Sequence, residues 1–359
     1  MATGDHRKDI RSIQMLRGIA ALLVVLFHGS IQLQRTGYDA DAFKWMQAGV
    51  DIFFVISGFI MWVTTEKAPD RTAGQFFLNR VQRIAPLYWL ITFAMTALLV
   101  VAPRMLQSAV LDVPHILKSL FFIAAYNQGT HEYQPLLVPG WTLNLEMFFY
   151  VLFSIAIAVA RGNRTIRLAT VTLLIGGAAV LPMLVPGLPG AITFYLQPII
   201  VEFLFGIILG WIYLARPIHL GFVGLAMAAA GFFLMGYNGY DNPYMPIYVA
   251  TGLPALMVVG GALFGTQIKS RPLEWLGNVS YSLYLTHALV LSAFAQVWKR
   301  LGLFETAAPS AFYIVSTAIC IIVAGIAYVT VEKPAQAIGR PRRTGAAPHP
   351  ALSGATSRR

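Results

Sequence analysis

The sequence contains little of what stabilises a soluble or secreted protein. Only 11% of its 359 residues are charged, whereas a soluble globular domain has roughly a quarter. Its single cysteine, Cys320, excludes a disulfide within the chain, and neither C-x-x-C nor H-E-x-x-H is present. A G-x-S-x-G elbow, a Walker loop and a G-x-G-x-x-G loop are also missing. We therefore expect no metal, and none of the chemistry that depends on these motifs.

Apolar residues are abundant and make up 57% of the chain. They gather in stretches of roughly 20 residues, the length of a helix that crosses a bilayer. The pattern predicts an all-α integral membrane protein with about ten transmembrane helices, the first retained rather than cleaved as a signal peptide. The expected spans are 12–31, 48–64, 86–101, 141–160, 166–184, 195–214, 219–235, 247–265, 279–297 and 311–331.

The net charge of +11 would suggest nucleic acid as a partner of a soluble protein, but here the basic residues flank the spans. With ten spans, 20 of the 26 Lys and Arg residues lie on the side of the two termini. The cytoplasmic bias of these residues predicts cytoplasmic termini, and membrane lipid rather than nucleic acid as their surroundings. We expect a cytoplasmic segment at 1–11, a transmembrane domain at 12–334 and a disordered tail at 335–359.

Two ionisable residues, Arg17 and His28, interrupt the first apolar stretch. They are eleven residues apart, which places them roughly 16 Å apart along nearly one face of a helix. Ionisable groups are costly in hydrocarbon, so the pair indicates a functional site. The structural alternative is that Arg17 reaches to the lipid head groups and His28 bonds to a neighbouring helix.

Asp51 lies one turn inside the second span. If the first two spans are antiparallel neighbours, Asp51 and His28 lie at similar depth. A carboxylate beside an imidazole fixes its tautomer, and the imidazole can then take a proton from a hydroxyl. The alternative is a hydrogen bond that only ties two helices together.

Arg80 and Arg83 belong to a segment that we interpret as a helix lying on the membrane surface before the span at 86–101. They are three residues apart and face the same way. Together with Arg17 they present three guanidinium groups, whose geometry matches phosphate oxygens. Anionic lipid is an equally good partner for such a cluster.

The outer part of the fourth span carries three candidate sugar-binding residues: Trp141, Asn144 and Glu146. The alternative for Trp141 is a place in the aromatic belt of the membrane interface. Two further ionisable residues lie inside spans. Glu202 is given no role, and His287 is expected to bridge helices.

Five segments of the chain occur in a recognisable order. These are the Arg17–His28 pair, GVDIFFVISGFIMW at 49–62, RVQRIAPLYW at 80–89, GWTLNLE at 140–146 and SYSLYLTH at 280–287. Together they resemble the membrane acyltransferase-3 family, and within it the bacterial exopolysaccharide O-acetyltransferases. The resemblance covers about residues 12–334. It implies ten core helices in a bacterial inner membrane.

The resemblance also implies an activity and its residues. An acyl group, usually acetyl, moves from cytoplasmic acyl-CoA to a hydroxyl of an extracytoplasmic polysaccharide or its lipid-linked precursor. His28 would be the catalytic residue, Arg17 its essential partner, and Arg80 and Arg83 the residues that engage acetyl-CoA. Three positions match the polar interior of the family: Asp51, Trp141 and Glu146.

Two routes for the reaction remain open from the sequence. His28 acts either as a general base or as a carrier of the acetyl group. A second class of function is also open, a transporter or flippase for a glycan or a lipid-linked sugar, because buried charges would line such a path as well.

Overall fold

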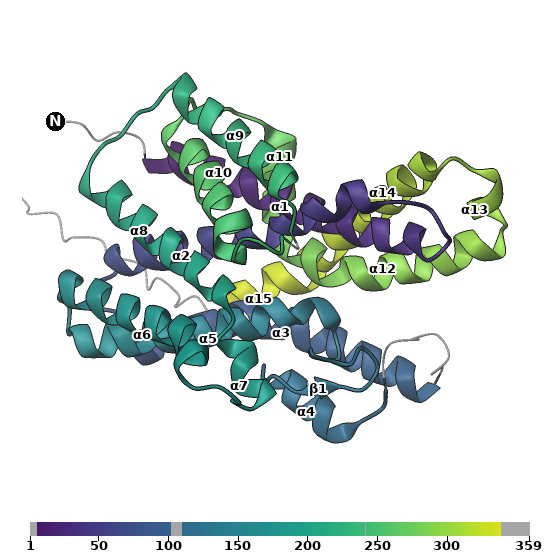
Figure 1. Ribbon diagram of the computed structural model, residues 1–359, viewed down its shortest axis with the longest axis horizontal. Coiled ribbons are helices and arrows are strands. Elements are labelled where there is room, and N and C mark those ends of the chain that lie inside the picture. Colours follow the sequence, from purple (N-terminus) through teal and green to yellow (C-terminus); the bar gives the residue numbers. More distant parts are fainter. Residues whose placement is uncertain (1–5, 102–109, 241, 339–359) are drawn as a thin grey trace, which may run out of the picture.

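The structure is a computed structural model that describes residues 6–101, 110–240 and 242–338. Within these ranges it is almost entirely helical (Figure 1), and strands occur in a single hairpin formed by β1 (Tyr126–Asn127) and β2 (Glu132–Tyr133). The prediction of an all-α protein is confirmed. The predicted tail from residue 339 onward lies outside the described residues.

Ten longer helices form the body of the part of the chain that the structure describes. They are α1 (His6–Gln34), α2 (Gly49–Glu66), α3 (Ala73–Val101), α5 (Trp141–Ala160), α6 (Arg164–Leu184), α8 (Val201–Ala215), α9 (Phe222–Asn238), α10 (Leu253–Phe264), α12 (Ser280–Arg300) and α14 (Pro309–Ala327). The shorter elements are η1 (Asp41–Ala48), α4 (Val113–Leu120), η3 (Val138–Gly140), α7 (Gly190–Tyr195), η4 (Pro198–Ile200), η5 (Tyr248–Gly252), α11 (Arg271–Asn278), α13 (Leu303–Thr306), η6 (Tyr328–Glu332) and α15 (Lys333–Ile338).

Seven helical segments of the described chain are long and apolar enough to cross a membrane. They are Arg11–Gln34, Asp41–Glu66, Ala73–Val101, Val138–Ala160, Arg164–Leu184, Gly190–Ala215 and Pro309–Ala337. The other three expected spans correspond to two shorter apolar helices, Phe222–Asn238 and Tyr248–Phe264, and to α12. The molecule therefore has the helices of a multi-pass membrane protein. The total of ten spans and the cytoplasmic termini stay predictions.

The expected surface helix before residue 86 is not a separate element. Helix α3 runs unbroken from Ala73 to Val101 with Pro86 inside it. Phe76 before the proline and Tyr88 after it are both buried in one apolar cluster, and this shared packing keeps the two halves of the helix together. Membrane helices tolerate proline because neighbouring groups satisfy the freed backbone positions. The two arginines of this segment consequently lie on a helix that is long and apolar enough to cross a membrane.

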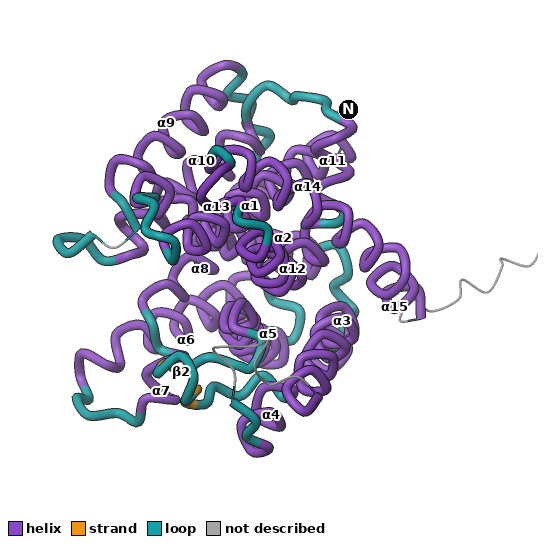
Figure 2. The backbone as a smooth tube through the Cα atoms, turned by 90° about the vertical axis from the view of Figure 1, so that its right-hand side faces the viewer, coloured by secondary structure: helices purple, strands orange, loops and turns teal. Residues whose placement is uncertain are grey.

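Helices α2 and α8 lie where two groups of helices meet. One group contains α1, α9, α10, α11 and α14, and the other contains α3 to α7 (Figures 1 and 2). Gly58 on α2 and Gly206 on α8 allow direct backbone contact, because a Cβ atom on either glycine would lie 2.0 Å from a carbonyl oxygen of the other helix. Small residues permit such close packing in membranes. This contact fixes the depth of α8 relative to α2.

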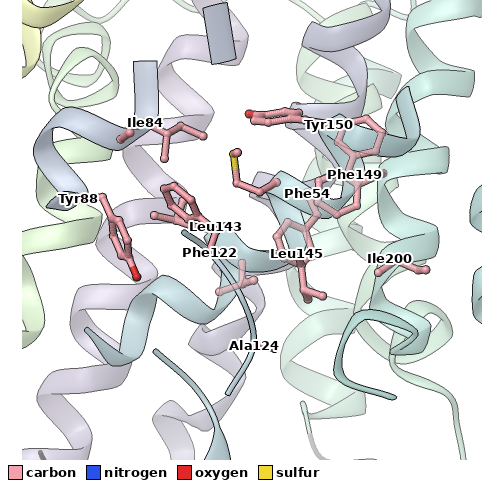
Figure 3. Close-up of a cluster of buried hydrophobic side chains, with 14 of the residues drawn as sticks. Phe54, Ile84, Tyr88, Phe122, Ala124, Leu143, Leu145, Phe149, Tyr150 and Ile200 are labelled. Atoms are coloured by element: carbon pink, nitrogen blue, oxygen red, sulfur yellow. The ribbon is translucent and has the colours of Figure 1, made fainter. Parts of the chain in front are cut away.

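Aromatic packing holds α5 between its neighbours (Figure 3). Tyr88 of α3 stacks on Phe122, with ring centroids 4.7 Å apart, and Phe149 of α5 stacks on Phe203 of α8 at 4.3 Å. Offset aromatic pairs add about 0.5–1.5 kcal/mol beyond the burial of their area. The first half of α5, which carries three predicted site residues, is therefore firmly placed.

Candidate active site

A cavity of about 90 Å³ lies between α1, α2, α3, α5 and α12, and we name it the central cavity. This volume has room for several water molecules. Most of its wall is apolar. Its polar lining includes Arg17, Ser57, Arg83, Glu146, Tyr150 and Tyr284.

Glu146 is held at the side of the central cavity by two hydroxyl groups. Ser57 Oγ donates a hydrogen bond to Glu146 Oε1 at 2.9 Å, and the Tyr150 hydroxyl donates to the same oxygen. Arg17 Nη1 donates to Gln14 Oε1 at 3.2 Å. Glu146 and Arg17 thus line one cavity from different helices, but no ion pair between them is present among the described residues.

A larger opening of about 570 Å³ adjoins the central cavity, and we name it the arginine mouth. Among the described residues, Arg17, Arg71, Arg80 and Arg83 line it, together with one acidic residue, Glu332. Arg17 and Arg83 line both spaces, so the arginine mouth and the central cavity meet at these two side chains.

The arginines of the mouth retain their capacity to bind an anion. None of the four has a carboxylate within 4 Å in the part of the chain that the structure describes. The Arg80 guanidinium lies 5.5 Å from the centre of the Phe76 ring, and its Nε is buried without a hydrogen-bond partner. Glu332 instead accepts hydrogen bonds from Ser282 Oγ at 2.5 Å and from Gln336 Nε2 at 3.0 Å. Unpaired guanidinium groups are well suited to phosphate.

His28 lies against His287, with ring centroids 4.7 Å apart. Its Nδ1 is 2.9 Å from the Val24 carbonyl oxygen, which can only accept, so Nδ1 carries the proton and Nε2 keeps its lone pair. His287 has the same arrangement, with Nδ1 3.2 Å from Leu283 O and a buried Nε2 that has no partner. The structure therefore presents two imidazoles whose Nε2 atoms can both accept a proton.

His28 is not itself among the residues that line the central cavity. His287 lies between: its ring is 5.8 Å from that of Tyr284, which does line the cavity. No motif in the sequence indicates this contact, because His28 is on α1 and His287 is on the distant α12. Helical spacing within one segment carries no information about such a pair.

The expected pair of His28 and Asp51 is not formed. Asp51 accepts a hydrogen bond from the Thr251 hydroxyl and lies beside Glu202, and both carboxyl groups are completely buried. Asp51, Val55 and Gly58 share one face of α2 at helical spacing, and that face packs on α8. The tautomer of His28 is consequently fixed by a backbone carbonyl instead of a carboxylate.

The three candidate sugar-binding residues are separated. Trp141 lines a third space of about 640 Å³, which we name the outer pocket, whereas Glu146 lines the central cavity. Asn144 is completely buried, and neither of its amide atoms has a hydrogen-bond partner among the described residues. Within the first turn and a half of α5, successive residues thus face different surroundings.

The outer pocket and the arginine mouth lie toward opposite ends of α2. Gln47, just before α2, lines the outer pocket, and Thr64 near its end lines the mouth. Seventeen residues at helical rise correspond to about 25 Å. Between the two, the Tyr284 hydroxyl is hydrogen-bonded to Thr142 Oγ1 at 2.8 Å and to Pro139 O at 3.0 Å. We name this hydrogen-bonded group the partition.

A multi-pass helical protein with an arginine-lined mouth opening into an internal cavity is the class that fold and site define. The chain belongs to the acyltransferase-3 family, since it matches that family, described as an acyltransferase domain, over residues 10–329. The resemblance seen in the sequence is confirmed.

Two curated relatives illustrate the match. The chain is 35% identical over 328 residues to the exopolysaccharide production protein ExoZ of Rhizobium meliloti (strain 1021), covering 89% of this chain and 96% of ExoZ. It is 24% identical over 355 residues to the O-acetyltransferase OatA of Staphylococcus aureus, covering 89% of this chain and 56% of OatA. No solved structure matches the chain.

Proposed function

We propose that the protein transfers an acetyl or other short acyl group from cytoplasmic acyl-CoA to a hydroxyl of an extracytoplasmic polysaccharide or its lipid-linked precursor. It would do so in a bacterial inner membrane. The observation that carries the proposal is the junction at Arg17 and Arg83, where a mouth suited to phosphates meets an internal cavity. Membership of an acyltransferase family supports the reaction, and the names of ExoZ and OatA support the type of acceptor.

In this proposal the arginine mouth binds the phosphates of acetyl-CoA through Arg80, Arg83 and Arg17. The pantetheine arm extends into the central cavity, whose lining on α2 runs from Val50 to Met61. Eleven residues at helical rise give a depth of about 16 Å, which an extended arm can span. The thioester then lies on the far side of the junction from the phosphates.

His28 provides the basic nitrogen of the reaction. As a general base, its Nε2 removes the proton of the sugar hydroxyl, the hydroxyl oxygen bonds to the thioester carbonyl carbon, and the carbon–sulfur bond breaks. The leaving CoA thiolate then takes up the proton. As an acyl carrier, Nε2 bonds to the thioester carbonyl carbon while the carbon–sulfur bond breaks and CoA leaves as a thiolate. The sugar hydroxyl oxygen then bonds to the acetyl carbon as the bond to Nε2 breaks, and the hydroxyl proton goes to the thiolate. His287 lies between His28 and the cavity lining, and so supports either route as a positioning residue.

A transporter or flippase for a glycan or lipid-linked sugar is the second candidate. The observation in its favour is the completely buried carboxyl pair of Asp51 and Glu202. Two carboxylates in contact in an apolar interior repel each other, so the pair is stable when it holds a proton. Proton-binding carboxyl groups of this kind are common in membrane transporters.

Labelled acetyl-CoA distinguishes the two functions. Purified protein in lipid nanodiscs is incubated with it and with de-O-acetylated exopolysaccharide from cells that carry the gene. The enzyme releases CoA thiol and labels the polysaccharide, whereas a transporter does neither. His28→Ala should lower kcat by about 10²–10⁴, the range of general acid–base catalysis.

The matched control is His219→Ala, because His219 is an exposed histidine outside the site. It should retain the activity of the unaltered protein. A folded His28→Ala variant with full activity would exclude the proposed role of His28, and folded protein that neither releases CoA nor labels the glycan would exclude the proposed enzyme.

A further inference from the structure

The outer pocket is formed by segments that are far apart in the sequence. The β1–β2 hairpin, α7, the start of α5 and the residues after α9 all contribute to it. Its volume of about 640 Å³ lies within the 300–1,000 Å³ range that is usual for small-molecule sites. Six side chains of its lining can contact a ligand through an aromatic ring or a carboxamide: Gln47, Tyr133, Gln134, Trp141, Gln197 and Tyr240.

The chemistry of this lining favours an uncharged, hydroxyl-rich ligand. Three of these six side chains are aromatic and three are carboxamides. Among the described residues that line the pocket, Glu132 is the one ionisable acidic residue, and none is Lys, Arg or His. An aromatic ring can pack against the C–H face of a sugar, while carboxamides both donate to and accept from its hydroxyls. An anionic ligand would meet Glu132 and no cation among the described lining residues.

Several polar atoms of the pocket are available for hydrogen bonds. Gln134 Oε1 is buried without a partner among the described residues. Gln197 donates through Nε2 to Phe194 O at 2.9 Å, which leaves its carboxamide oxygen as an acceptor. Burial, and then the nearby carboxyl groups of Asp51 and Glu202, raise the pKa of Tyr240 well above its usual value, so its phenol keeps its proton; Gln47 is its side-chain hydrogen-bond partner.

The aromatic wall at Tyr133 is held in a fixed position. Tyr133 pairs with Tyr126 across the hairpin, and their rings lie edge to face at 5.7 Å. Its ring also covers the backbone of Gly190 so closely that a Cβ atom there would lie 2.3 Å from the ring. A rigid wall loses little freedom when a ligand binds.

We infer that the outer pocket is the acceptor subsite and that it binds a short, uncharged stretch of the glycan. Trp141 and Thr142 are consecutive residues of α5, and Thr142 belongs to the partition and lines the central cavity. A sugar packed on Trp141 is therefore separated by the partition from the place proposed for the thioester. The inference rests on the proposed function for the identity of the ligand.

The test measures sugar binding in the absence of acetyl-CoA. The probe is the set of oligosaccharides obtained by cutting de-O-acetylated exopolysaccharide of the cells that carry the gene, titrated calorimetrically into full-length protein in nanodiscs. Trp141→Ala, Gln197→Ala and Gly190→Ala should each raise the Kd for these oligosaccharides at least tenfold and leave that for acetyl-CoA unchanged. Gly176→Ala is the matched control, because Gly176 has open space around it.

The possible outcomes separate this inference from the proposed function. Equal oligosaccharide affinity in folded variants and unaltered protein, or no binding by the unaltered protein, overturns the acceptor subsite. Acetyl transfer with an unchanged acceptor KM in all three variants also overturns it, while the proposed function stands. Loss of sugar binding in a protein that transfers no acetyl group supports the subsite and rejects the proposed enzyme. Thermal unfolding of each variant checks the fold.

Discussion

The arginine mouth and the outer pocket are similar in volume, about 570 and 640 Å³, but opposite in chemistry. Among the described residues, the mouth is lined by four arginines and one acidic residue, Glu332, whereas the outer pocket is lined by aromatic and carboxamide side chains, one acidic residue, Glu132, and no cation. The central cavity between them is far smaller, at about 90 Å³. This difference suits the proposed function, in which each end binds a different ligand and only a slender acyl-bearing chain enters the central cavity.

Among changes at the two ends of the molecule, the largest effect should come from Arg17→Ala, because Arg17 lies where the mouth meets the central cavity. Loss of a hydrogen bond from a charged group costs about 1.5–3 kcal/mol, so kcat/KM for acetyl-CoA should fall roughly 10- to 150-fold. Steady-state CoA release at varied acetyl-CoA concentration measures this kcat/KM. The control Arg35→Ala changes an exposed arginine just beyond α1 and should match the unaltered protein. Unchanged kcat/KM in folded Arg17→Ala would remove the junction from the mechanism.

Arg83→Ala should weaken the binding of acetyl-CoA, the acyl donor, and leave the binding of the glycan unchanged. We expect the KM for acetyl-CoA to rise roughly tenfold, with partial recovery in Arg83→Lys, because lysine keeps the charge but loses the planar geometry that suits phosphate. Oligosaccharide affinity should not change, and calorimetry with each ligand checks the comparison. If acetyl-CoA affinity is unaltered while activity depends on anionic lipid, the mouth binds lipid head groups instead.

A change in ionic strength should distinguish ligand binding in the arginine mouth from ligand binding in the outer pocket, without any substitution. Raising the salt from about 0.05 M to about 0.5 M shortens the Debye length to a few Å, which weakens exposed charge interactions. The Kd for acetyl-CoA should rise several-fold, whereas the Kd for the de-O-acetylated oligosaccharides should stay constant. Equal salt dependence for both ligands would contradict the chemical contrast between the pockets.

The smallest effect is expected at the partition. Tyr284→Phe removes a hydroxyl that is bonded to Thr142 and Pro139, a loss of about 0.5–1.5 kcal/mol per hydrogen bond. Without acceptor, acetyl-CoA should then be hydrolysed two- to fivefold faster, because water enters the central cavity more easily. This increase corresponds to an activation barrier for hydrolysis that is lower by about 1 kcal/mol or less. CoA release without glycan measures this, with exposed Tyr237→Phe as control. An unchanged rate would show that Tyr284 does not exclude water.

Hydropathy predicts the long helices of this protein well, and helix α5 coincides with its expected span, Trp141–Ala160. Hydropathy does not show reliably where one helix ends and the next begins. Helix α3 continues through Pro86 because both halves pack on one cluster, which no local pattern reveals. Short helices such as α11 and α15 were not predicted, because their stretches are too polar and too brief to stand out.

The sequence allowed the residue types of the site to be predicted, but not which of these residues contact one another. Asp51 meets Glu202 because glycines on α2 and α8 allow those helices to touch, and Gly58 and Gly206 were the only local signs of it. His28 meets His287 through packing between distant helices. The outer pocket is built largely from connecting segments, where neither hydropathy nor helical spacing carries information.

Two fixed positive charges, those of Arg17 and Arg83, stand where the mouth narrows into the membrane interior. Positive charges at a constriction repel protons and sodium ions, as they do in water-selective channels. A cell could therefore keep this passage hydrated between turnovers without dissipating its proton gradient. Proteoliposomes carrying a double replacement by alanine should leak protons faster than those with the unaltered protein.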